Sequence, residues 1–362
     1  MNQLISLVPF PGKVLRGKGA LGKIGPLCSE LGTKVFIMGG KTALTITQEV
    51  MNHSLGESNL LIVGQEWYGG ECSYTNQKSL EEKIQTSGAD LIITVGGGKA
   101  MDTGKLVAVS MKLPLVTVPT IAATCASMAS VSVVYNDQGQ FVDVVELEKC
   151  PDGIVIDTEI IAKAPVRWLA AGLGDTLAKW YEYRVSILKA PKNGLTLGAL
   201  ANGRLCYDLI KEFGGAAMES AKKGEHSEAV DSAVDAIILY AAIASLIGGT
   251  TVRAVAAHAF YNGLTQIPAS HGAGHGLTVG YGNLVLLAIE DRSDEEVVEA
   301  IELAWACGVP TQLKEIVELN DQEKEMVAQA VLKNPDMKSM PFEVTKEMLW
   351  NAVERVDRLA EK

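Results

Sequence analysis

Three histidines in one short stretch are the residues of this chain best suited to chemistry. His258, His271 and His275 fall within eighteen residues, although the 362-residue chain has only five histidines. His258 lies in an apolar helical pattern, whereas His271 and His275 lie in a glycine-rich segment. A single histidine on an apolar helix is often a core residue. Three imidazoles gathered in this way favour a transition-metal site instead.

Asp175 offers the carboxylate that such a site would use. It follows Gly172 and Gly174 at a point where a helix could begin, so it could equally be an N-cap. One carboxylate and two imidazoles with an open position suit catalytic Zn²⁺ or Fe²⁺. The residues alone leave both interpretations of Asp175 open.

A glycine run, Gly96–Gly98, is the second chemical feature. It follows the apolar β-type run 91–95 and leads into Lys99 and a helical pattern. Glycines let the backbone approach a ligand closely, and a helix start presents free N–H groups to a phosphate. The spacing matches neither a P-loop nor a strict Gly-x-Gly-x-x-Gly motif. We therefore expect a nucleotide site rather than a kinase or ATPase, with a tight turn without ligand as the alternative.

The elements that would position these residues alternate in the first half of the chain. Apolar runs at 35–38, 60–63, 91–95 and 115–118 are separated by helical patterns at 42–54, 75–88 and 100–111. Runs at 131–135 and 141–145 flank a turn and predict a hairpin, and 154–156 closes the set of strands. This alternation predicts an α/β layer with a largely parallel sheet.

After Pro165 the strand patterns stop. Alanine-rich helical patterns cover 166–189, 192–213, 227–247, 250–265, 275–290, 294–307, 321–334 and 345–360. We therefore expect an α/β dinucleotide-binding domain over residues 1–163 and an all-α, metal-binding domain over residues 164–362. A cleft between two such domains is a usual place for a small-molecule site.

Composition argues against several classes of function. The net charge of -11 argues against nucleic acid or an anionic membrane surface as partner. The longest apolar run, 236–247, is too short to span a bilayer, and residues 1–13 lack the features of a signal peptide. Six dispersed cysteines without a Cys-x-x-Cys pair predict reduced thiols in a cytoplasmic protein.

Taken together, these segments resemble the iron-containing (group III) alcohol dehydrogenases, in particular their glycerol-dehydrogenase-like branch. The resemblance spans nearly the whole chain, and it is carried by residues 96–105, 119–124, 132–135, 174–175, His258 with 262–263, and 275–276. It implies a Rossmann-like N-terminal domain and a helical C-terminal domain, the dehydroquinate-synthase-like fold. It also implies that Asp175, His258 and His275 are the metal ligands. The nucleotide contacts that it implies are Gly97, Gly98, Lys99, Asp102, Thr117, Thr120, Val131 and Tyr135.

One departure from the family pattern, together with a lysine near the implied metal ligands, bears on the substrate. Where glycerol dehydrogenases have an Asp that binds substrate hydroxyls, this chain has Cys125, a poor acceptor without fixed charge, or simply a small cavity-lining residue. Lys179 follows Asp175 by four residues, so it could hold a substrate carboxylate or be a solvated lysine. This pattern looks like the hydroxycarboxylate dehydrogenase subgroup. His271 is a candidate for relaying the alcohol proton, with a plain loop histidine as the alternative.

The segment after the second strand bears on the cofactor. Residues 38–42 contain no acidic residue to hold the ribose 2′-hydroxyl of NAD, and Lys41 would accept a 2′-phosphate by charge. We therefore expect NADP, with NAD as the alternative, together with one divalent metal, Zn²⁺ or Fe²⁺.

The sequence thus predicts a metal-dependent, NAD(P)-linked oxidoreductase of CH–OH groups that interconverts 2-hydroxy and 2-oxo acids. A glycerol or polyol dehydrogenase is the first alternative. A lyase resembling dehydroquinate synthase is the second, although it would require more basic residues near the ligands. A nucleotide-binding protein without catalysis is a third, against which the complete metal set argues. We expect a small-molecule substrate, a homo-oligomer, and neither nucleic acid nor membrane as partner.

Overall fold

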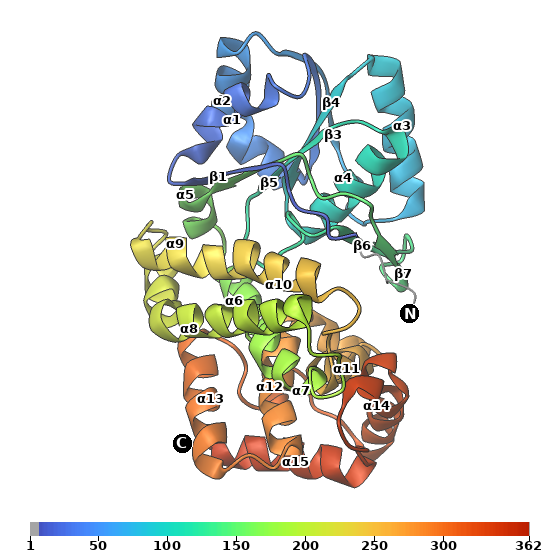
Figure 1. Cartoon of the computed structure of the whole chain (residues 1–362), viewed down its shortest axis with the longest axis vertical. Coiled ribbons are helices and arrows are strands. Elements are labelled where there is room, and N and C mark those ends of the chain that lie inside the picture. The colour runs from blue at the N-terminus through green and yellow to red at the C-terminus, as the bar shows by residue number, and fades with distance from the viewer. Residues whose placement is uncertain (1–6, 362) are drawn as a thin grey trace. The chain divides into compact units, whose positions relative to one another are not determined.

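The computed structural model describes residues 7–361, which form two compact units (Figure 1). The first, termed the α/β unit, runs to Ala164 and includes Gly224–His226. The second, termed the helical unit, comprises Pro165–Lys223 and the residues from Ser227 onward.

The α/β unit is built on a six-stranded sheet in which every neighbouring pair of strands is parallel. From edge to edge its strands are β1 (Lys13–Gly17), β8 (Gly153–Asp157), β5 (Leu115–Pro119), β4 (Leu91–Gly96), β2 (Lys34–Gly39) and β3 (Leu61–Trp67). The predicted α/β class with a parallel sheet is confirmed. Strand β1 was not predicted, because this edge strand is short, largely exposed and interrupted by charged residues.

Helices cover both faces of this sheet (Figure 1). They are α1 (Ile24–Cys28) and α2 (Lys41–Glu57) on one face, and α3 (Tyr74–Ser87) and α4 (Gly98–Met111) on the other; α5 (Thr158–Ala162) follows β8, and the 3₁₀ helix η1 is Ala20–Lys23. Strands buried on both faces must be apolar throughout, which is why β2, β4 and β5 read as continuous apolar runs.

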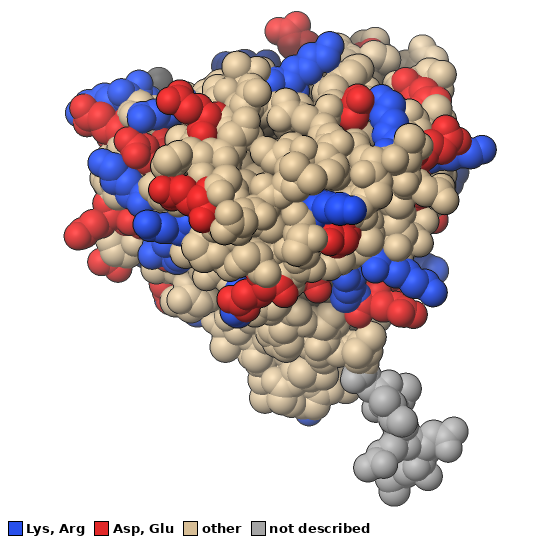
Figure 2. Space-filling model, turned by 90° about the horizontal axis from the view of Figure 1, so that it is seen from above, with Lys and Arg blue, Asp and Glu red and all other residues tan. Residues whose placement is uncertain are grey.

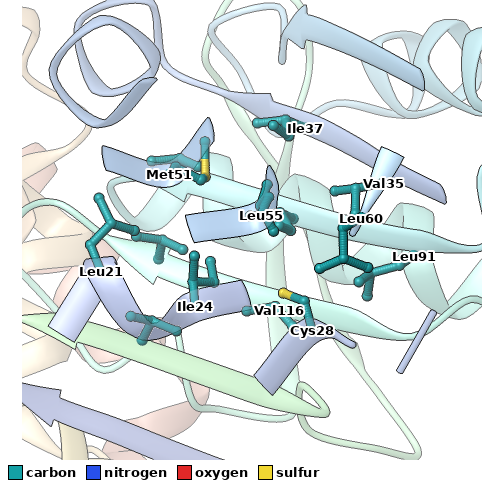
Figure 3. Close-up of a cluster of buried hydrophobic side chains, with 14 of the residues drawn as sticks. Leu21, Ile24, Cys28, Val35, Ile37, Met51, Leu55, Leu60, Leu91 and Val116 are labelled. Carbon is teal, nitrogen blue, oxygen red and sulfur yellow. The ribbon is translucent and has the colours of Figure 1, made fainter. Parts of the chain in front are cut away.

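Successive residues of β2 point into two different cores. Val35 and Ile37 pack with Met51 and Leu55 of α2 in the core that Figure 3 shows. Phe36, between them, packs in a second core with side chains of α3 and α4. Because side chains alternate between the two faces of a strand, β2 packs against both layers of helices.

A separate hairpin follows the sheet strands. Strand β6 (Val131–Tyr135) pairs antiparallel with β7 (Phe141–Glu146), as predicted. The Oδ1 atom of Asn136 accepts hydrogen bonds from the backbone N–H groups of Gln138 and Gln140, which closes the turn.

The helical unit contains no strand among its described residues. Its α-helices are α6 (Arg167–Tyr181), α7 (Tyr183–Ser186), α8 (Gly194–Lys222), α9 (Glu228–Val234), α10 (Ala241–Gly248), α11 (Ala256–Leu264), α12 (His275–Ile289), α13 (Asp294–Ala306), α14 (Asp321–Lys333) and α15 (Lys346–Leu359). A π-helical turn, η2 (Asp235–Tyr240), joins α9 to α10, and short 3₁₀ turns are η3 (Pro268–Gly272), η4 (Leu313–Glu315) and η5 (Pro335–Ser339). Helix α12 is buried on nearly all sides and packs against α6, α11, α13 and α15.

Three predicted helices differ from the structure in their bounds by several residues, and one of them is the helix expected over 192–213, which is α8 and continues to Lys222. The pattern at 166–189 is interrupted at Glu182, which separates α6 from α7, and the helix expected from residue 250 begins only at Ala256. The N-cap interpretation of Asp175 is wrong, because Asp175 lies in the interior of α6. Gly172 and Gly174 do not start the helix, and Gly174 lets helix α12 approach α6 closely.

The continuous helical stretch Glu228–Gly248 is long and apolar enough to cross a membrane by those criteria alone. A search for uninterrupted apolar runs does not find this stretch, because Asp231 and Asp235 interrupt the apolar pattern. Half of its apolar window is buried inside the protein, where it packs against α8, as a core helix of a soluble protein does. This stretch is therefore weak evidence for a membrane span.

On the face shown in Figure 2, basic and acidic side chains are interspersed rather than gathered by sign. Exposed ion pairs also occur in the protein, such as Lys83 with Glu66 at 2.8 Å. Pairs of this kind contribute little to stability, about 0 to 1 kcal/mol each.

Candidate functional site

Asp175, His258 and His275 converge in the helical unit. One ligand atom from each residue lies within 4.8 Å of the other two. The Nε2 atom of His275 lies 3.2 Å from Asp175 Oδ1, and the Nε2 atom of His258 lies 3.6 Å from the same oxygen. These side chains come from α6, α11 and the first residue of α12, so three helices build the cluster.

Glycines explain how α6 and α12 come close enough to bring Asp175 to His275. A Cβ atom at Gly276 would lie 2.2 Å from the carbonyl oxygen of Ala171, and one at Gly174 would lie 2.6 Å from the carbonyl oxygen of Gly276. Any side chain at these two positions would push the helices apart. The amide of Asn283 adds a hydrogen bond of 3.0 Å to the carbonyl of Gly174.

Glu182 holds His258 from the side away from Asp175. Its Oε2 atom lies 2.5 Å from His258 Nδ1, and its Oε1 atom accepts hydrogen bonds from the backbone N–H groups of Val255 and His258, at 2.8 and 3.0 Å. Burial alone would lower the pKa of His258, but the carboxylates of Glu182 and Asp175 outweigh it and raise the pKa to about 10. Glu182 is not among the site residues predicted from the sequence. Its only signal is its position seven residues, or two helical turns, after Asp175.

The donor set of this cluster fits a divalent metal. Burial would raise the pKa of Asp175, yet hydrogen bonds from His258 and His275 hold it well below its usual range, so the carboxylate is ionised at neutral pH. Because Nδ1 of His258 faces Glu182, its Nε2 is directed at the cluster. One carboxylate oxygen and two imidazole nitrogens could hold Zn²⁺ or Fe²⁺ and leave positions for a substrate.

Two other predicted residues of the helical unit lie outside this cluster. His271 is exposed in η3, and its Nε2 lies 3.0 Å from the carbonyl oxygen of Thr265. Lys179 is half-buried on α6, one turn after Asp175, with its Nζ 5.6 Å from the ring centre of Tyr183. A residue that no motif marked, Tyr261, packs its ring edge-on against His275, with centres 4.4 Å apart.

The glycine run lies at the carboxyl end of β4, where α4 begins. From β2 the chain continues to β3 on one side, and from β4 it continues to β5 on the other side. The neighbouring strands β2 and β4 therefore form a topological switch point of the sheet, which is the usual place for a ligand in open α/β folds. Gly96 has φ +146°, a conformation that favours glycine. The backbone N–H of Thr120 at the end of β5 donates to the carbonyl of Gly96 at 3.0 Å.

A small hollow lies beside this turn. A Cβ atom at Gly97 would lie 2.7 Å from Ile121 Cδ1, and one at Gly98 would lie 3.4 Å from Thr124 Oγ1, so the glycines keep the hollow open. Ser127 also lines the hollow, and its buried hydroxyl has no hydrogen-bond partner in the structure. The start of the 14-residue helix α4 supplies free N–H groups and a positive dipole end there.

A buried ion pair lies under this turn. Lys105 Nζ is 2.8 Å from Asp102 Oδ1, and the Lys105 side chain is only 2% exposed. The ammonium also donates to the carbonyls of Ala129, at 3.2 Å, and Val131. Asp102 Oδ2 accepts the N–H of Val133 at 3.2 Å, and burial raises its pKa despite these partners. Asp102 thus joins α4 to the start of β6.

The remaining predicted nucleotide residues surround the same end of the sheet. Lys99 forms an ion pair with Glu71, with its Nζ 5.3 Å from the ring centre of Tyr135. The fully buried Thr117 donates its hydroxyl to the carbonyl of Ser127 at 2.8 Å. Lys41, the first residue of α2, lies with its Nζ 4.3 Å from the ring centre of Trp67.

Cys125 lies half-buried in the loop between β5 and β6. Its carbonyl oxygen accepts the backbone N–H groups of Met128 and Ala129, at 3.0 and 3.1 Å, so the loop turns at this residue. It directly follows Thr124, which lines the hollow at the glycine run.

Comparison with known proteins agrees with this architecture. Residues 11–158 match the iron-containing alcohol dehydrogenase family. Glycerol dehydrogenase of Pseudomonas putida is 34% identical over 363 residues, 98% of each chain. Hydroxycarboxylate dehydrogenase A of Escherichia coli strain K12 is 32% identical over 296 residues, 80% of this chain and 81% of that protein. The crystal structure of glycerol dehydrogenase from Schizosaccharomyces pombe matches at a TM-score of 0.89 and 29% identity, over 99% of this chain and 91% of that chain.

The fold and these relatives define an oxidoreductase of the alcohol dehydrogenase class. The chain belongs to the iron-containing alcohol dehydrogenase family, within its glycerol-dehydrogenase-like branch. The resemblance inferred from the sequence is therefore confirmed.

Proposed function

We propose that this protein is a metal-dependent, NAD(P)-linked dehydrogenase that interconverts 2-hydroxy acids and 2-oxo acids. The observation that carries the proposal is the position of Lys179, one helical turn from Asp175 in the Asp175–His258–His275 cluster. A cation beside a metal centre suits a substrate with a carboxylate next to its reacting carbon. Cys125 supports the same conclusion, because it contributes no fixed negative charge that would repel such an anion.

In this proposal a metal-binding domain of residues 164–362 holds the metal through Asp175, His258 and His275. When bound, the cation would supply Lewis-acid polarisation of the substrate oxygen, and the nicotinamide would supply or accept the hydride. Lys179 binds and orients the substrate carboxylate. His271 passes the alcohol proton to solvent, for which its exposed position in η3 is suitable.

A dinucleotide-binding domain of residues 1–163 binds the nucleotide in this proposal. Gly97 and Gly98 admit the diphosphate to the start of α4, and Lys99, Asp102, Thr117, Thr120, Val131 and Tyr135 line or support that turn. We further propose NADP as the preferred cofactor, because Lys41 stands at the carboxyl end of β2 and residues 38–42 offer no carboxylate to a ribose 2′-hydroxyl.

The substrate proposal is tested by NADPH and NADH oxidation at 340 nm, with metal-loaded enzyme, 2-oxo acids and dihydroxyacetone. Loss of a charge-assisted contact costs about 1.5–3 kcal/mol. We therefore expect Lys179→Ala to lower kcat/KM for 2-oxo acids roughly 10- to 100-fold and to leave dihydroxyacetone unaffected. Lys222→Ala, at the exposed end of α8, is the control and should change neither. An unchanged KM for every oxo acid in Lys179→Ala contradicts the role of Lys179.

A polyol dehydrogenase is the second candidate. It is favoured by the similarity to proteins named glycerol dehydrogenase, which include the Pseudomonas putida enzyme. Turnover of dihydroxyacetone alone in the same assay would support it and make Cys125 a neutral replacement. A lyase resembling dehydroquinate synthase would show no net consumption of NADPH with any of these substrates.

The cofactor proposal is tested by Lys41→Glu. We expect the KM for NADPH to rise at least about tenfold, because an anion then faces the 2′-phosphate, while the KM for NADH changes little. Lys23→Glu reverses the charge of another exposed lysine in the same unit and is the control. Equal use of both cofactors, unaffected by Lys41→Glu, would exclude an NADP preference set by this residue.

We also propose that the protein is a cytoplasmic homo-oligomer. Large exposed apolar side chains such as Leu188 and Trp305, 66% and 67% exposed, support self-association. Light scattering of the purified protein at micromolar concentration tests this, and a mass of one chain would exclude it.

A further inference from the structure

We propose that Glu182 is a positioning residue that aims His258 at the metal and makes metal binding and the start of helix α11 depend on each other. The proposal rests on the metal site of the proposed function but not on the substrate or on hydride transfer. Glu182 stands at the break between α6 and α7, two turns after Asp175 on the same stretch of chain. It is therefore tied covalently to one ligand and by hydrogen bonds to another.

The contacts of Glu182 determine which nitrogen of His258 is available to a metal. An ionised carboxylate only accepts hydrogen bonds, so the 2.5 Å contact between Glu182 Oε2 and His258 requires the hydrogen on Nδ1. In the neutral ring, the form that a metal binds, the lone pair is then left on Nε2, the nitrogen that lies toward Asp175. Carboxylate–histidine pairs of this kind orient metal ligands and increase their basicity.

The second oxygen of Glu182 caps α11. This helix starts at Ala256, and its N-cap residue, Val255, makes no side-chain cap. Glu182 Oε1 accepts the N–H of Val255 and that of His258, the third helical residue, which is the donor that a local N-cap side chain would satisfy. A carboxylate also interacts favourably with the positive end of the helix dipole.

Both roles fall on one side chain that is only 1% exposed. Rotation of Glu182 away from His258 Nδ1 would uncap α11, and fraying of α11 would remove the N–H groups that hold the carboxylate in place. Metal binding at Nε2 of His258 should therefore stabilise the first turn of α11. A substitution of Glu182 should in turn weaken metal binding, although Glu182 does not itself bind the metal.

The experiment compares Glu182→Gln with wild type and with Glu290→Gln. Glu290 is another carboxylate of the helical unit, with a side chain that is 10% exposed and paired with Arg184 and Arg292, and it is not part of the metal cluster. Zn²⁺ affinity is measured by competition with a chromophoric chelator, and the site geometry by the visible spectrum of the Co²⁺-loaded protein. Neither readout involves activity of the enzyme.

We expect Glu182→Gln to bind Zn²⁺ about 10- to 100-fold more weakly and to alter the Co²⁺ spectrum. The glutamine amide can donate to Nδ1, which favours the tautomer with hydrogen on Nε2, or it can turn its oxygen to Nδ1 and lose both backbone donors. Glu290→Gln should lower stability and leave Zn²⁺ affinity and the Co²⁺ spectrum unchanged. Equal Zn²⁺ affinity in wild type and Glu182→Gln would overturn the positioning role.

A second measurement uses the wild-type protein, so it does not depend on the folding of a variant. Hydrogen exchange of peptides covering residues 249–262 is followed with and without Zn²⁺. We expect Zn²⁺ to slow exchange of these amides and to leave exchange in α13 unchanged. Unchanged exchange at the start of α11 would overturn the coupling between metal binding and this helix. A wild-type protein that takes up no Zn²⁺ would overturn the metal site and the role of Glu182 together. Zn²⁺ uptake without any NAD(P)H oxidation would overturn only the dehydrogenase.

Discussion

Replacing Asp102 by Asn should leave the buried ammonium of Lys105 without its charged partner, beneath the glycine turn. Lys105 is 2% exposed, and the single oxygen of an Asn side chain could accept from Lys105 Nζ or from the N–H of Val133 but not from both, and it would carry no charge. Removing one member of a buried ion pair costs about 3–5 kcal/mol, because the other charge cannot return to water without opening the structure. We expect Asp102→Asn to reduce the free energy of unfolding by an amount in this range.

The reverse replacement should cost less. In Lys105→Met the Asp102 carboxyl can take up a proton, since burial already raises its pKa, so no net charge stays buried. We expect a loss of roughly 1–3 kcal/mol, the cost of an imperfectly satisfied polar group. The double variant should lose less than the sum of the two, with a coupling energy of about 1–3 kcal/mol. Lys149→Met is the control, because Lys149 and Asp152 form an ion pair at the same spacing with both side chains partly exposed, and it should cost about 0–1 kcal/mol.

Urea unfolding followed by circular dichroism gives these energies, and hydrogen exchange of α4 peptides shows that the loss falls in the α/β unit. NADPH affinity, measured by fluorescence titration, separates two roles of Asp102. If Asp102 acts by holding Lys105, the double variant should bind NADPH more tightly than Asp102→Asn. If Asp102 contacts the nucleotide directly, both should bind equally weakly. If Asp102→Asn lowers the free energy of unfolding by less than about 1 kcal/mol, the Asp102–Lys105 pair is hydrated and is not a buried ion pair.

Three further predictions concern separate features. Gly97→Ala should weaken NADPH binding at least about tenfold in the same titration, because the new Cβ would lie 2.7 Å from Ile121 Cδ1. Gly56→Ala is the control, because a Cβ there would have no atom within 4 Å. It should leave NADPH binding unchanged and raise the free energy of unfolding by up to about 1 kcal/mol. Asp175→Asn should reduce the Zn²⁺ content of dialysed protein from about one ion per chain to nearly none, by elemental analysis; retention of the metal would exclude Asp175 as a ligand. Burial raises the pKa of Cys28 and of Cys307 to about 12. Because the unfolded thiols ionise near 9, each should subtract about 1.4 kcal/mol per pH unit between pH 9 and 12, and the alanine variant of each should make urea-measured stability correspondingly less dependent on pH in that range.

Much of the α/β unit could be predicted from the sequence because its elements are defined by local patterns. A strand buried on both faces must be a continuous apolar run, and β2, β4 and β5 were predicted on that basis. The hairpin of β6 and β7 follows from a turn between two strand patterns. Strand β1 has neither signal, since it lies at the edge of the sheet and is held by pairing with β8, about 140 residues away in the chain.

The candidate site shows where local patterns stop being informative. The residue types of Asp175, His258 and His275 marked them as candidates, and the family resemblance selected them over His271. The sequence could not show that Asp175 lies inside α6, because the glycines before it also fit a helix start. One of them, Gly174, allows close contact with α12, which lies about 100 residues away in the chain. No local pattern encodes such a contact.

By itself, the sequence determined the fold class, the family and a short set of candidate ligands, since these depend on residue type, periodicity and spacing. Only the tertiary structure decided that one carboxylate oxygen lies within 3.6 Å of two imidazole nitrogens, that Glu182 holds the second nitrogen of His258, and that Lys105 is buried against Asp102. Each of these facts depends on how closely helices and strands distant in the chain pack. That distance is set by the side chains, or the missing side chains, of both partners together.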